Sequence, residues 1–397
     1  MKQSSRPVAH TYRYESFGGI LRLNRPPSLI WVDQNYMREL GYAESDLWQA
    51  PSGLLSAPTE VHLQPTNRCG AGCRACYTDA DGPSVASLVE WPVDKFKSVI
   101  DRLAQMKVFH LALGGGESVD CLPVFDLAAY AREKGLLPSL TTNGLNLTPD
   151  LAKQCRVFET VHVSLDGVKE VYAATRGYDG FDQADRALHL LREAGCKVGI
   201  NAVFSRLSAD RLVELIAYAR KVGVKQIELL RFKPAGRAKS WYEAMRPTAE
   251  QFDVLLPQLT AAMKRYRVRI LVDCSLAPMI YAHRPAAKTM DFFGVTGCLG
   301  GNMLLSISPT GRVGPCSFAA TEPWDIHDLS GWWKKDEAFR TFRYWKAEAP
   351  EPCRSCDYLD LCLGGCHVVA EYVTGRASNP DPDCLFVRRH LAQSAGH

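Results

Sequence analysis

The chain has 397 residues, 46% of them hydrophobic, so it is long enough to form more than one packed core. Lysine and arginine number 47 against 43 aspartates and glutamates, without a long basic run, which argues against a nucleic-acid partner. The N-terminus lacks the apolar segment of a secretory signal, and no apolar stretch reaches the roughly 18 residues that span a bilayer. We therefore expect a cytoplasmic protein without a membrane partner. In that reducing compartment the 14 cysteines should be metal ligands or reactive thiols rather than disulfides.

Residues 1–56 form an N-terminal extension that precedes the repeating part of the chain. The stretches "TYRYESFGGILRLN" and "SLIWVDQNYMRELGY" predict a hairpin and a helix, bounded by Pro26 and Pro27. No residue pattern in this segment points to chemistry. A packing extension is the plain interpretation, and a peptide-docking element is the alternative.

The region 57–240 alternates short β-branched runs with amphipathic helical segments. The expected strands are 60–66, 108–114, 136–142, 160–166, 197–204 and 226–232. The clearest helical segments are 92–106, 181–195 and 209–223. The last two end at Gly195 and Gly223, which are typical helix stops. About six such units predict an α/β fold built as a partial (β/α)6 TIM-like barrel, with active groups on the loops that follow the strands.

The rest of the chain differs from this repeat. Residues 241–290 read as a connector with one helix, at about 248–265, and one strand in "RVRILVD". From residue 291 to 397 cysteines, glycines and prolines are dense and regular elements are short. This composition predicts a small α+β domain that folds around metal.

Three cysteines follow the first expected strand directly: Cys69, Cys73 and Cys76, with the spacing C-x3-C-x2-C. Structural zinc normally takes four ligands, so three thiolates on one loop leave a position open. A four-iron cluster takes one ligand per iron, and three ligands leave one iron free to bind substrate. Gly70 and Gly72 allow the loop to turn all three sulfurs inward. The motif resembles the signature of the radical S-adenosylmethionine (SAM) superfamily, whose open iron chelates SAM; zinc or free thiols are the alternatives.

The resemblance extends through the barrel region. "GGGES" is similar to the family's Gly-Gly-Glu element, which implies that Gly115 and Gly116 admit SAM close to the backbone and that Glu117 receives its ammonium group. "VSLDG" and "ATRGYDG" are similar to family members in which a serine contacts the ribose and an arginine the methionine carboxylate. These roles then fall to Ser164 and Arg176. A turn, a strand-end hydroxyl and a surface arginine are the plain alternatives, and no catalytic base is implied.

Polar residues on or after other expected strands have simpler explanations. Asn143 and Gly144 in "TTNG" fit the family, but they are equally good turn residues. His62, His110 and His162 lie on three expected strands. We expect hydrogen-bonded histidines of the core rather than ligands or catalysts.

The C-terminal region contains a second cysteine pattern, made of Cys298, Cys316, Cys353, Cys356, Cys362, Cys366 and Cys384. Its spacing resembles the SPASM domain, an iron–sulfur extension of peptide maturases in this superfamily. The resemblance implies two auxiliary [4Fe-4S] clusters: one held by Cys353, Cys356, Cys362 and Cys384, and one nearer the barrel held by Cys298, Cys316 and Cys366. Since seven ligands cannot close two four-iron clusters, either one iron stays open or Cys274 is the eighth ligand. Zinc is the alternative for the C-x2-C pieces.

The resemblance implies a function as well as a fold. An electron passed into SAM gives a 5′-deoxyadenosyl radical that takes a hydrogen atom from the substrate, while the protein orients the target bond and excludes side reactions. Most SPASM enzymes act on ribosomal peptides, so we expect peptide crosslinking or side-chain oxidation, with a flavodoxin or ferredoxin-type reductant. Ser317 stands where sulfatase maturases carry an acid, which argues against that activity. A tetrapyrrole or other small-molecule precursor is the alternative substrate, and a non-catalytic iron–sulfur electron carrier is the alternative function.

Overall fold

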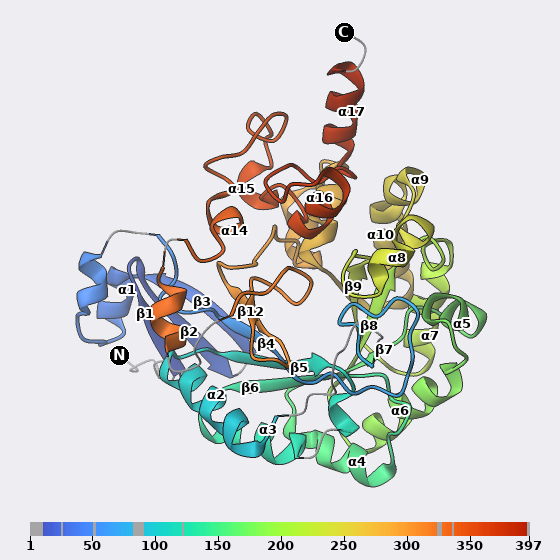
Figure 1. The fold of residues 1–397 in the computed structure, drawn as a ribbon, viewed down its shortest axis with the longest axis horizontal. Coiled ribbons are helices and arrows are strands. Elements are labelled where there is room, and N and C mark those ends of the chain that lie inside the picture. Colours follow the sequence, from blue (N-terminus) through green and yellow to red (C-terminus); the bar gives the residue numbers. More distant parts are fainter. Residues whose placement is uncertain are drawn as a thin grey trace, which may run out of the picture.

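The computed structural model describes residues 11–24, 27–50, 53–81, 91–120, 123–323, 328–335 and 337–394. Its centre is a nine-stranded sheet (Figure 1). The strands are β4 (Glu60–Thr66), β5 (His110–Gly115), β6 (Leu137–Thr142), β7 (Val161–Ser164), β8 (Val198–Phe204), β9 (Gln226–Arg231), β10 (Arg269–Val272), β11 (Leu304–Ile307) and β12 (Val313–Gly314). They lie in the order β10-β9-β8-β7-β6-β5-β4-β11-β12, and only β11 and β12 pair antiparallel.

The six strands predicted between residues 60 and 232 are all present, in chain order from β4 to β9. This confirms the α/β prediction. Among the described strands, β10 and β12 stand at the two ends of the sheet and do not pair with each other, so the barrel is open. The predicted connector contributes β10 to this sheet, because that strand pairs in parallel with β9.

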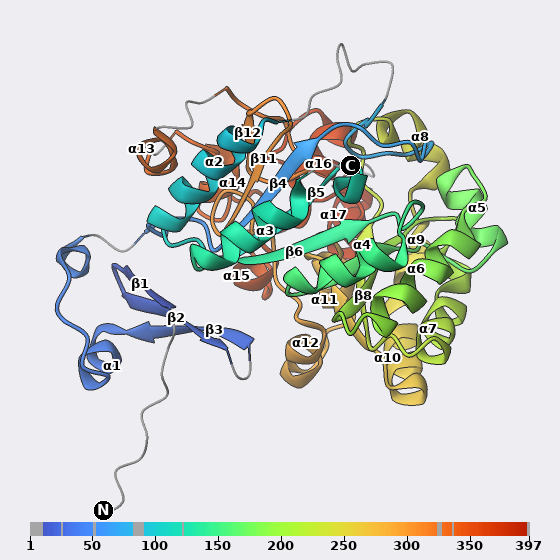
Figure 2. The ribbon, with the colours of Figure 1, turned by 90° about the horizontal axis from the view of Figure 1, so that it is seen from below.

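Helices cover the outer face of the curved sheet (Figures 1 and 2). They are α2 (Val93–Gln105), α3 (Val124–Glu133), α4 (Pro149–Gln154), α5 (Glu170–Arg176), α6 (Phe181–Glu193), α7 (Leu212–Lys221), α9 (Ala249–Asp253) and α10 (Leu255–Tyr266). Helix α8 (Ala238–Met245) lies at the inner side instead, where it packs against residues of the C-terminal region. The single helix expected at 248–265 is therefore two helices. Pro257 explains the break, because it has no N–H to donate and its ring clashes with the carbonyl of Asp253 in a continuous helix.

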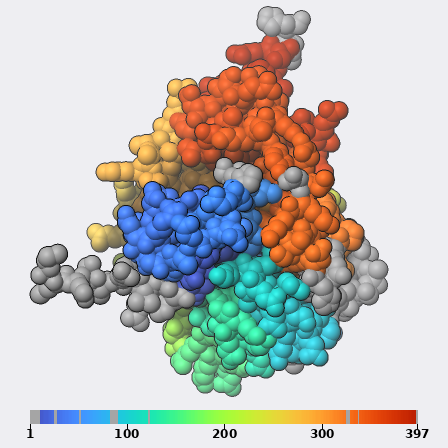
Figure 3. Space-filling model, turned by 90° about the vertical axis from the view of Figure 1, so that its left-hand side faces the viewer, coloured from blue at the N-terminus to red at the C-terminus, as the bar shows by residue number. Residues whose placement is uncertain are grey.

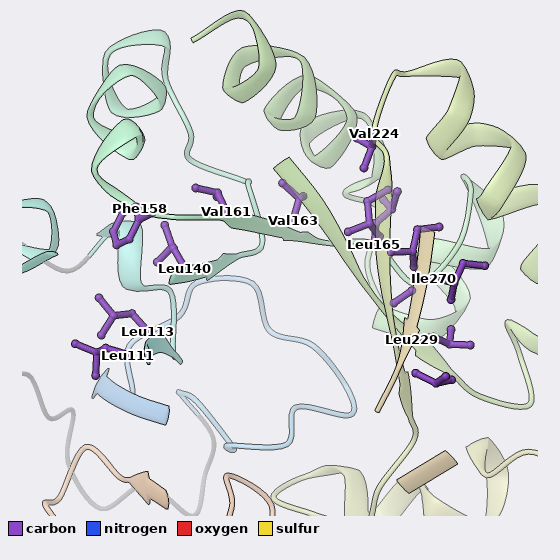
Figure 4. Close-up of a cluster of buried hydrophobic side chains, with 14 of the residues drawn as sticks. Leu111, Leu113, Leu140, Phe158, Val161, Val163, Leu165, Val224, Leu229 and Ile270 are labelled. Atoms are coloured by element: carbon purple, nitrogen blue, oxygen red, sulfur yellow. The ribbon is translucent and has the colours of Figure 1, made fainter. Parts of the chain in front are cut away.

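The outer side chains of the strands form the main core. Figure 4 shows Leu111, Val161, Val163 and Ile270 among the apolar side chains gathered there, and all four are almost fully buried. Burying one such side chain stabilises the fold by about 1.5–3 kcal/mol. Because side chains alternate along a strand, the residues between these positions, such as His162 in β7, point to the inner side of the sheet.

The C-terminal region lies on the opposite side of the sheet from α2, α3 and α4 (Figures 1 and 2). Its helices are α13 (Leu329–Trp333), α14 (Arg340–Tyr344), α15 (Leu359–Cys362), α16 (His367–Thr374) and α17 (Leu385–Ser394). The connector before it contains α11 (Ala277–Tyr281) and most of α12 (Ala287–Phe293). The C-terminal region also joins the sheet itself, since β11 pairs in parallel with β4. No helix in the described ranges has both the length and the apolar character needed to cross a membrane.

The N-terminal extension forms a separate three-stranded antiparallel sheet of β1 (Thr11–Glu15), β2 (Gly18–Asn24) and β3 (Pro27–Asp33), followed by α1 (Gln34–Glu39). The predicted hairpin is confirmed, but the segment expected to be helical begins with β3, whose "LIWV" run favours a strand. Pro26 lies outside the described residues. Buried Arg13 ties this sheet to the barrel by donating to the carbonyls of Ala57 and Pro58, each at 2.8 Å. Figure 3 shows the resulting surface, with the blue extension beside cyan and orange segments.

Candidate functional site

A large cavity with a volume of about 610 Å³ occupies the inner side of the sheet. The residues assigned to the first cluster and to SAM line it together: Cys69, Cys73, Cys76, Gly115, Gly116, Glu117, Ser164 and Arg176. Pockets for small ligands usually measure about 300–1,000 Å³. The volume of this cavity lies within that range, so it has room for a cofactor-sized ligand.

The cysteine loop follows β4 and carries its thiols beside N–H donors. Asn143 Nδ2 lies 3.6 Å from the sulfur of Cys69, and Arg176 Nη1 donates to the sulfur of Cys73 at 3.8 Å. Such donors stabilise the negative charge of a sulfur that binds metal. Gly72 has a left-handed backbone with φ of +64°, which favours glycine. Gly70, in contrast, would meet no atom within 4 Å if it carried a Cβ.

Arg237, in the segment that follows β9, also holds the cysteine loop in place. The guanidinium of Arg237 donates to the carbonyl of Cys73 at 3.1 Å, to the carbonyl of Ala80 at 2.8 Å and to the carboxylate of Asp79 at 2.9 Å. The loop is thus held between β4, where it begins, and the segment that follows β9. This arrangement keeps the thiols oriented toward the cavity.

Glu117 links the ends of two strands inside the cavity. Its carboxylate is buried and accepts hydrogen bonds from the backbone N–H groups of Asn143, at 2.7 Å, and Val119, at 3.2 Å. Burial raises the pKa of Glu117 to about 7, although these hydrogen bonds oppose the shift. A Cβ on neighbouring Gly116 would stand 2.1 Å from the carbonyl oxygen of Arg68. The space that the resemblance assigned to SAM at Gly116 is therefore occupied by the cysteine loop's own backbone.

Arg176 is held in place by a residue that the sequence did not single out. Asp166 Oδ2 lies 2.9 Å from Arg176 Nε, and Asp166 Oδ1 accepts a hydrogen bond from the N–H of Val203 at 2.9 Å. Burial alone would lower the pKa of Arg176, but the Asp166 carboxylate raises it above its usual value. Asp166 stands two residues after Ser164 in "VSLDG", so the signal was present in the quoted motif.

These residues fit the cofactors that the resemblance implies. Three thiols from one loop suit a cluster, and a buried acid and a half-buried arginine in the same cavity suit the amino and carboxylate groups of SAM. Asn201, which pairs in register with Ser164, has a buried Oδ1 without a hydrogen-bond partner in the part of the chain that the structure describes. Such an atom normally has a partner, so it leaves a place for a polar ligand.

The four cysteines assigned to the outer auxiliary cluster line one pocket: Cys353, Cys356, Cys362 and Cys384. The stacked rings of Tyr281 and Tyr358, with centroids 5.0 Å apart, lie in its wall. Burial raises the pKa of the Cys353 thiol to about 12, so metal binding must displace a firmly held proton.

The cysteines assigned to the inner auxiliary cluster gather around Lys233. The thiols of Cys274 and Cys298 are hydrogen-bonded to each other, and Cys316 lies next to both. Cys366 belongs to a small apolar cluster against which Cys316 packs, and it interacts with Lys233. The fold thus brings Cys274 to two cysteines of the motif, Cys298 and Cys316, although Cys274 is 24 residues from the nearest of them in sequence.

The spacing of these thiols bears on the zinc alternative. Within the described ranges, no group of three or more His, Cys, Asp or Glu side chains is arranged to hold one metal ion. Zinc draws four ligands to a single point at about 2.3 Å from each sulfur, whereas a four-iron core spreads them because each iron takes one.

The three histidines are not residues of the packed core. His62, His110 and His162 all line the cavity, together with Glu60 and Glu228. His62 is hydrogen-bonded as expected, but the buried Nε2 of His162 has no hydrogen-bond partner among the described residues. The core prediction was wrong because strand alternation turns these positions inward, opposite to their buried neighbours.

Comparison with known proteins agrees with this geometry. Residues 63–219 match the radical SAM superfamily. Mycofactocin maturase MftC of Mycolicibacterium smegmatis is 31% identical over 342 residues, covering 83% of each chain. PqqA peptide cyclase of Methylocella silvestris is 29% identical over 365 residues, covering 88% of this chain and 93% of that one.

Solved structures share the fold. Streptococcus suis SuiB bound to its precursor peptide SuiA has a TM-score of 0.73 at 17% identity, covering 94% of this chain and 98% of that one. Native anSMEcpe with bound AdoMet has a TM-score of 0.65 at 19% identity, covering 85% and 99%. With the sequence matches, these observations show that the protein belongs to the radical SAM superfamily and is an enzyme that uses SAM and a [4Fe-4S] cluster.

Proposed function

We propose that this enzyme forms a 5′-deoxyadenosyl radical from SAM and uses it to crosslink, or to oxidise a side chain of, a ribosomally made peptide. The observation that carries the proposal is the open cavity, which is lined by the residues assigned to SAM and has space beyond them. One sequence relative is named a peptide cyclase, and a protein of the same fold has been solved with a precursor peptide. Both facts support a peptide substrate over a tetrapyrrole or another small molecule.

In this proposal the first cluster is held by Cys69, Cys73 and Cys76, and when reduced it supplies the electron that cleaves SAM. Glu117 receives the ammonium group of SAM, and Arg176 pairs with its carboxylate. Ser164, at the end of β7, contacts the ribose. Asn143 and Asp166 act by holding Glu117 and Arg176 in place.

Two auxiliary [4Fe-4S] clusters would occupy the C-terminal cysteine sets. The outer cluster takes Cys353, Cys356, Cys362 and Cys384, which line one pocket. The inner cluster takes Cys298, Cys316 and Cys366, with Cys274 as the eighth ligand. The close approach of Cys274 to Cys298 and Cys316 supports this choice over an open iron.

The N-terminal extension, residues 1–56, is the proposed docking element for the peptide. Strand β3 is at the edge of its sheet, and its side chains Ile30 and Trp31 are 38% and 44% exposed. An extended peptide can add to such an edge through main-chain hydrogen bonds, with apolar side chains giving further contact. Residues 57–240 then form the catalytic barrel, 241–290 the connector, and 291–397 the auxiliary-cluster domain.

The test uses anaerobically reconstituted protein, SAM and a synthetic peptide encoded by a short reading frame beside the gene. Dithionite replaces the flavodoxin or ferredoxin-type reductant. We expect 5′-deoxyadenosine together with a peptide that has lost hydrogen, detected by mass spectrometry. If 5′-deoxyadenosine forms but the peptide stays unchanged, the small-molecule alternative is favoured. If about 12 irons bind but no 5′-deoxyadenosine forms, the electron-carrier alternative is favoured.

A further inference from the structure

A group of carboxylate and histidine side chains faces the cavity in addition to the residues assigned to SAM. This carboxylate–histidine cluster consists of Glu60 and His62 on β4, His110 on β5, His162 on β7 and Glu228 on β9. Nothing in the proposed binding of SAM or of the iron–sulfur clusters uses any of them. Buried or half-buried charged groups are costly unless they are paired or have a function.

The two carboxylates of this cluster differ in how closely they are paired with the histidines. Glu60 Oε1 lies 2.9 Å from His62 Nε2, and Glu60 Oε2 lies 4.0 Å from His110 Nδ1. Glu228 Oε2 lies 3.9 Å from His162 Nε2. The Glu60 carboxylate is therefore within hydrogen-bond distance of His62, whereas the Glu228 carboxylate has no partner at such a distance among the described residues.

The strand register places Glu228 level with the proposed SAM site. Glu228 on β9 pairs with Asn201 on β8, and Asn201 pairs with Ser164 on β7. Neighbouring strands are about 4.8 Å apart, so two strand spacings put Glu228 roughly 10 Å from Ser164 along the sheet. On its other side, Glu228 interacts with Lys233, which lies beside Cys274. Glu228 thus stands between the SAM residues and the inner cysteine set.

The protonation state of Glu228 suits proton transfer near neutral pH. Burial raises the pKa of Glu228 to about 7, and the negative charges of Glu60 and Asp273 add to the shift. His62 and Lys233 oppose it, and His162 faces the carboxylate from β7. Although it lies deep in the molecule, the side chain keeps 39% of its surface open to the cavity. The pKa of Glu60 is lowered. The pKa values of Glu60 and Glu228 are therefore shifted in opposite directions, as in acid–base pairs of enzymes.

We propose that Glu228 is the general base that accepts the proton released when the substrate is oxidised, an inference that rests on the proposed function. Joining two substrate atoms, or making a double bond, breaks two bonds to hydrogen and forms one new bond. One hydrogen leaves as an atom and completes 5′-deoxyadenosine. The other would leave as a proton to Glu228, and the auxiliary cluster that the inner cysteine set would hold would supply the acceptor for its electron. The open cavity then lets the Glu228 carboxyl group return its proton to solvent.

The experiment compares wild-type enzyme with Glu228→Gln, Glu228→Asp and the control Glu159→Gln, using the synthetic peptide described above. Glu159 also lines the cavity, but its carboxylate is paired with Lys197 at 2.8 Å and Arg132 at 3.3 Å. We expect E228Q to bind the peptide normally and to form 5′-deoxyadenosine within about threefold of wild type, with modified peptide reduced about 100-fold or more. E228D should recover part of that loss, and E159Q should match wild type.

The pH profile and infrared spectroscopy give independent readouts. The base works only when ionised, so wild-type product formation should fall about tenfold per pH unit below pH about 7, whereas the residual E228Q rate should not. The infrared difference spectrum between wild type and E228Q, both without peptide, should show a carboxylic acid signal that titrates near pH 7, because the signal of Glu117, whose pKa is also about 7, cancels in the difference. Wild-type levels of product in E228Q, or a parallel loss of peptide affinity, would overturn the proposal.

Failure of the proposed function is seen separately, as absence of modified peptide in the wild type before any variant is compared. The infrared titration then tests, without any peptide product, whether Glu228 is an acid–base group that titrates near pH 7. A carboxylic acid signal near pH 7 that E228Q removes supports an acid–base group in the cavity. The absence of that signal rejects it.

Discussion

Arg231 and Asp381 form a buried, two-pronged ion pair, with Nη1 2.6 Å from Oδ2 and Nη2 3.2 Å from Oδ1. Arg231 is the last residue of β9, and Asp381 lies three residues before Cys384. Asp381 Oδ2 also accepts a hydrogen bond from the backbone N–H of Cys366 at 3.0 Å. One pair therefore connects the barrel to a loop that carries proposed ligands of both auxiliary clusters.

Replacing Asp381 with Asn should destabilise the protein by about 3 kcal/mol, because it leaves the buried guanidinium of Arg231 with less negative charge. Thermal unfolding of the reconstituted enzyme measures the loss, and iron analysis should show fewer bound irons. Asp360→Asn is the matched control, since the Asp360 side chain is 73% exposed in its pair with Lys346. Equal melting temperatures for the two variants would contradict a structural role for the buried pair.

Replacing Gly116 with Ala should displace the cysteine loop, because the added Cβ would lie 2.1 Å from the carbonyl oxygen of Arg68. Overpacking of this kind costs about 1–3 kcal/mol, and here the clashing atom is backbone. We expect the variant to lose about four irons and to lose SAM binding. Gly70→Ala should keep both, because that position is open. The idea fails if G116A binds SAM and iron like the wild type.

Replacing Cys274 with Ser tests the eighth ligand. If Cys274 closes the inner cluster, C274S should change the electron paramagnetic resonance spectrum of the reduced auxiliary clusters while leaving the SAM-binding cluster intact. Cys196→Ala serves as the control, because Cys196 packs at the edge of the core and its thiol donates to the carbonyl of Ala152. An unchanged C274S spectrum would mean that the inner cluster has an open iron instead.

Replacing Glu60 with Gln tests how the carboxylate–histidine cluster sets the pKa of Glu228. The charge of Glu60 raises that pKa, so its removal should shift the infrared titration of Glu228 and the pH profile of product formation to lower pH. SAM cleavage should continue, because Glu60 lies at the opposite end of β4 from the cysteine loop. A pH profile identical to that of the wild type would show that Glu60 does not act on Glu228.

The order of the strands and the first cysteine motif could be predicted because both depend on local patterns. Apolar runs of β4 to β9 fix the sheet, and Cys69 follows the first of them at the end where parallel strands carry their active groups. Glu117 and Arg176 were identified only through the resemblance, yet both line the cavity.

What could not be predicted depends on contacts between distant segments. Asp381 carries no local signal, and Cys274 could be named only as one of two alternatives, since the partners of both lie on other elements of the fold. The prediction that the three histidines belong to the core failed for a different reason. Their strands were correctly located, but which face of each strand lies against the helices is decided by the whole sheet, so His162 was expected in the core and lines the cavity instead.

The pairing of β11 with β4 means that the C-terminal region also protects the barrel from other molecules. Leu305 lies opposite Val61, so removal of this region would leave β4 with a row of backbone groups that have no partner. Exposed strand edges recruit further copies of a chain, so a barrel fragment that ends before residue 291 should aggregate rather than act as a smaller enzyme. Evolutionary loss of the auxiliary cysteines would therefore require a new way to cap that edge.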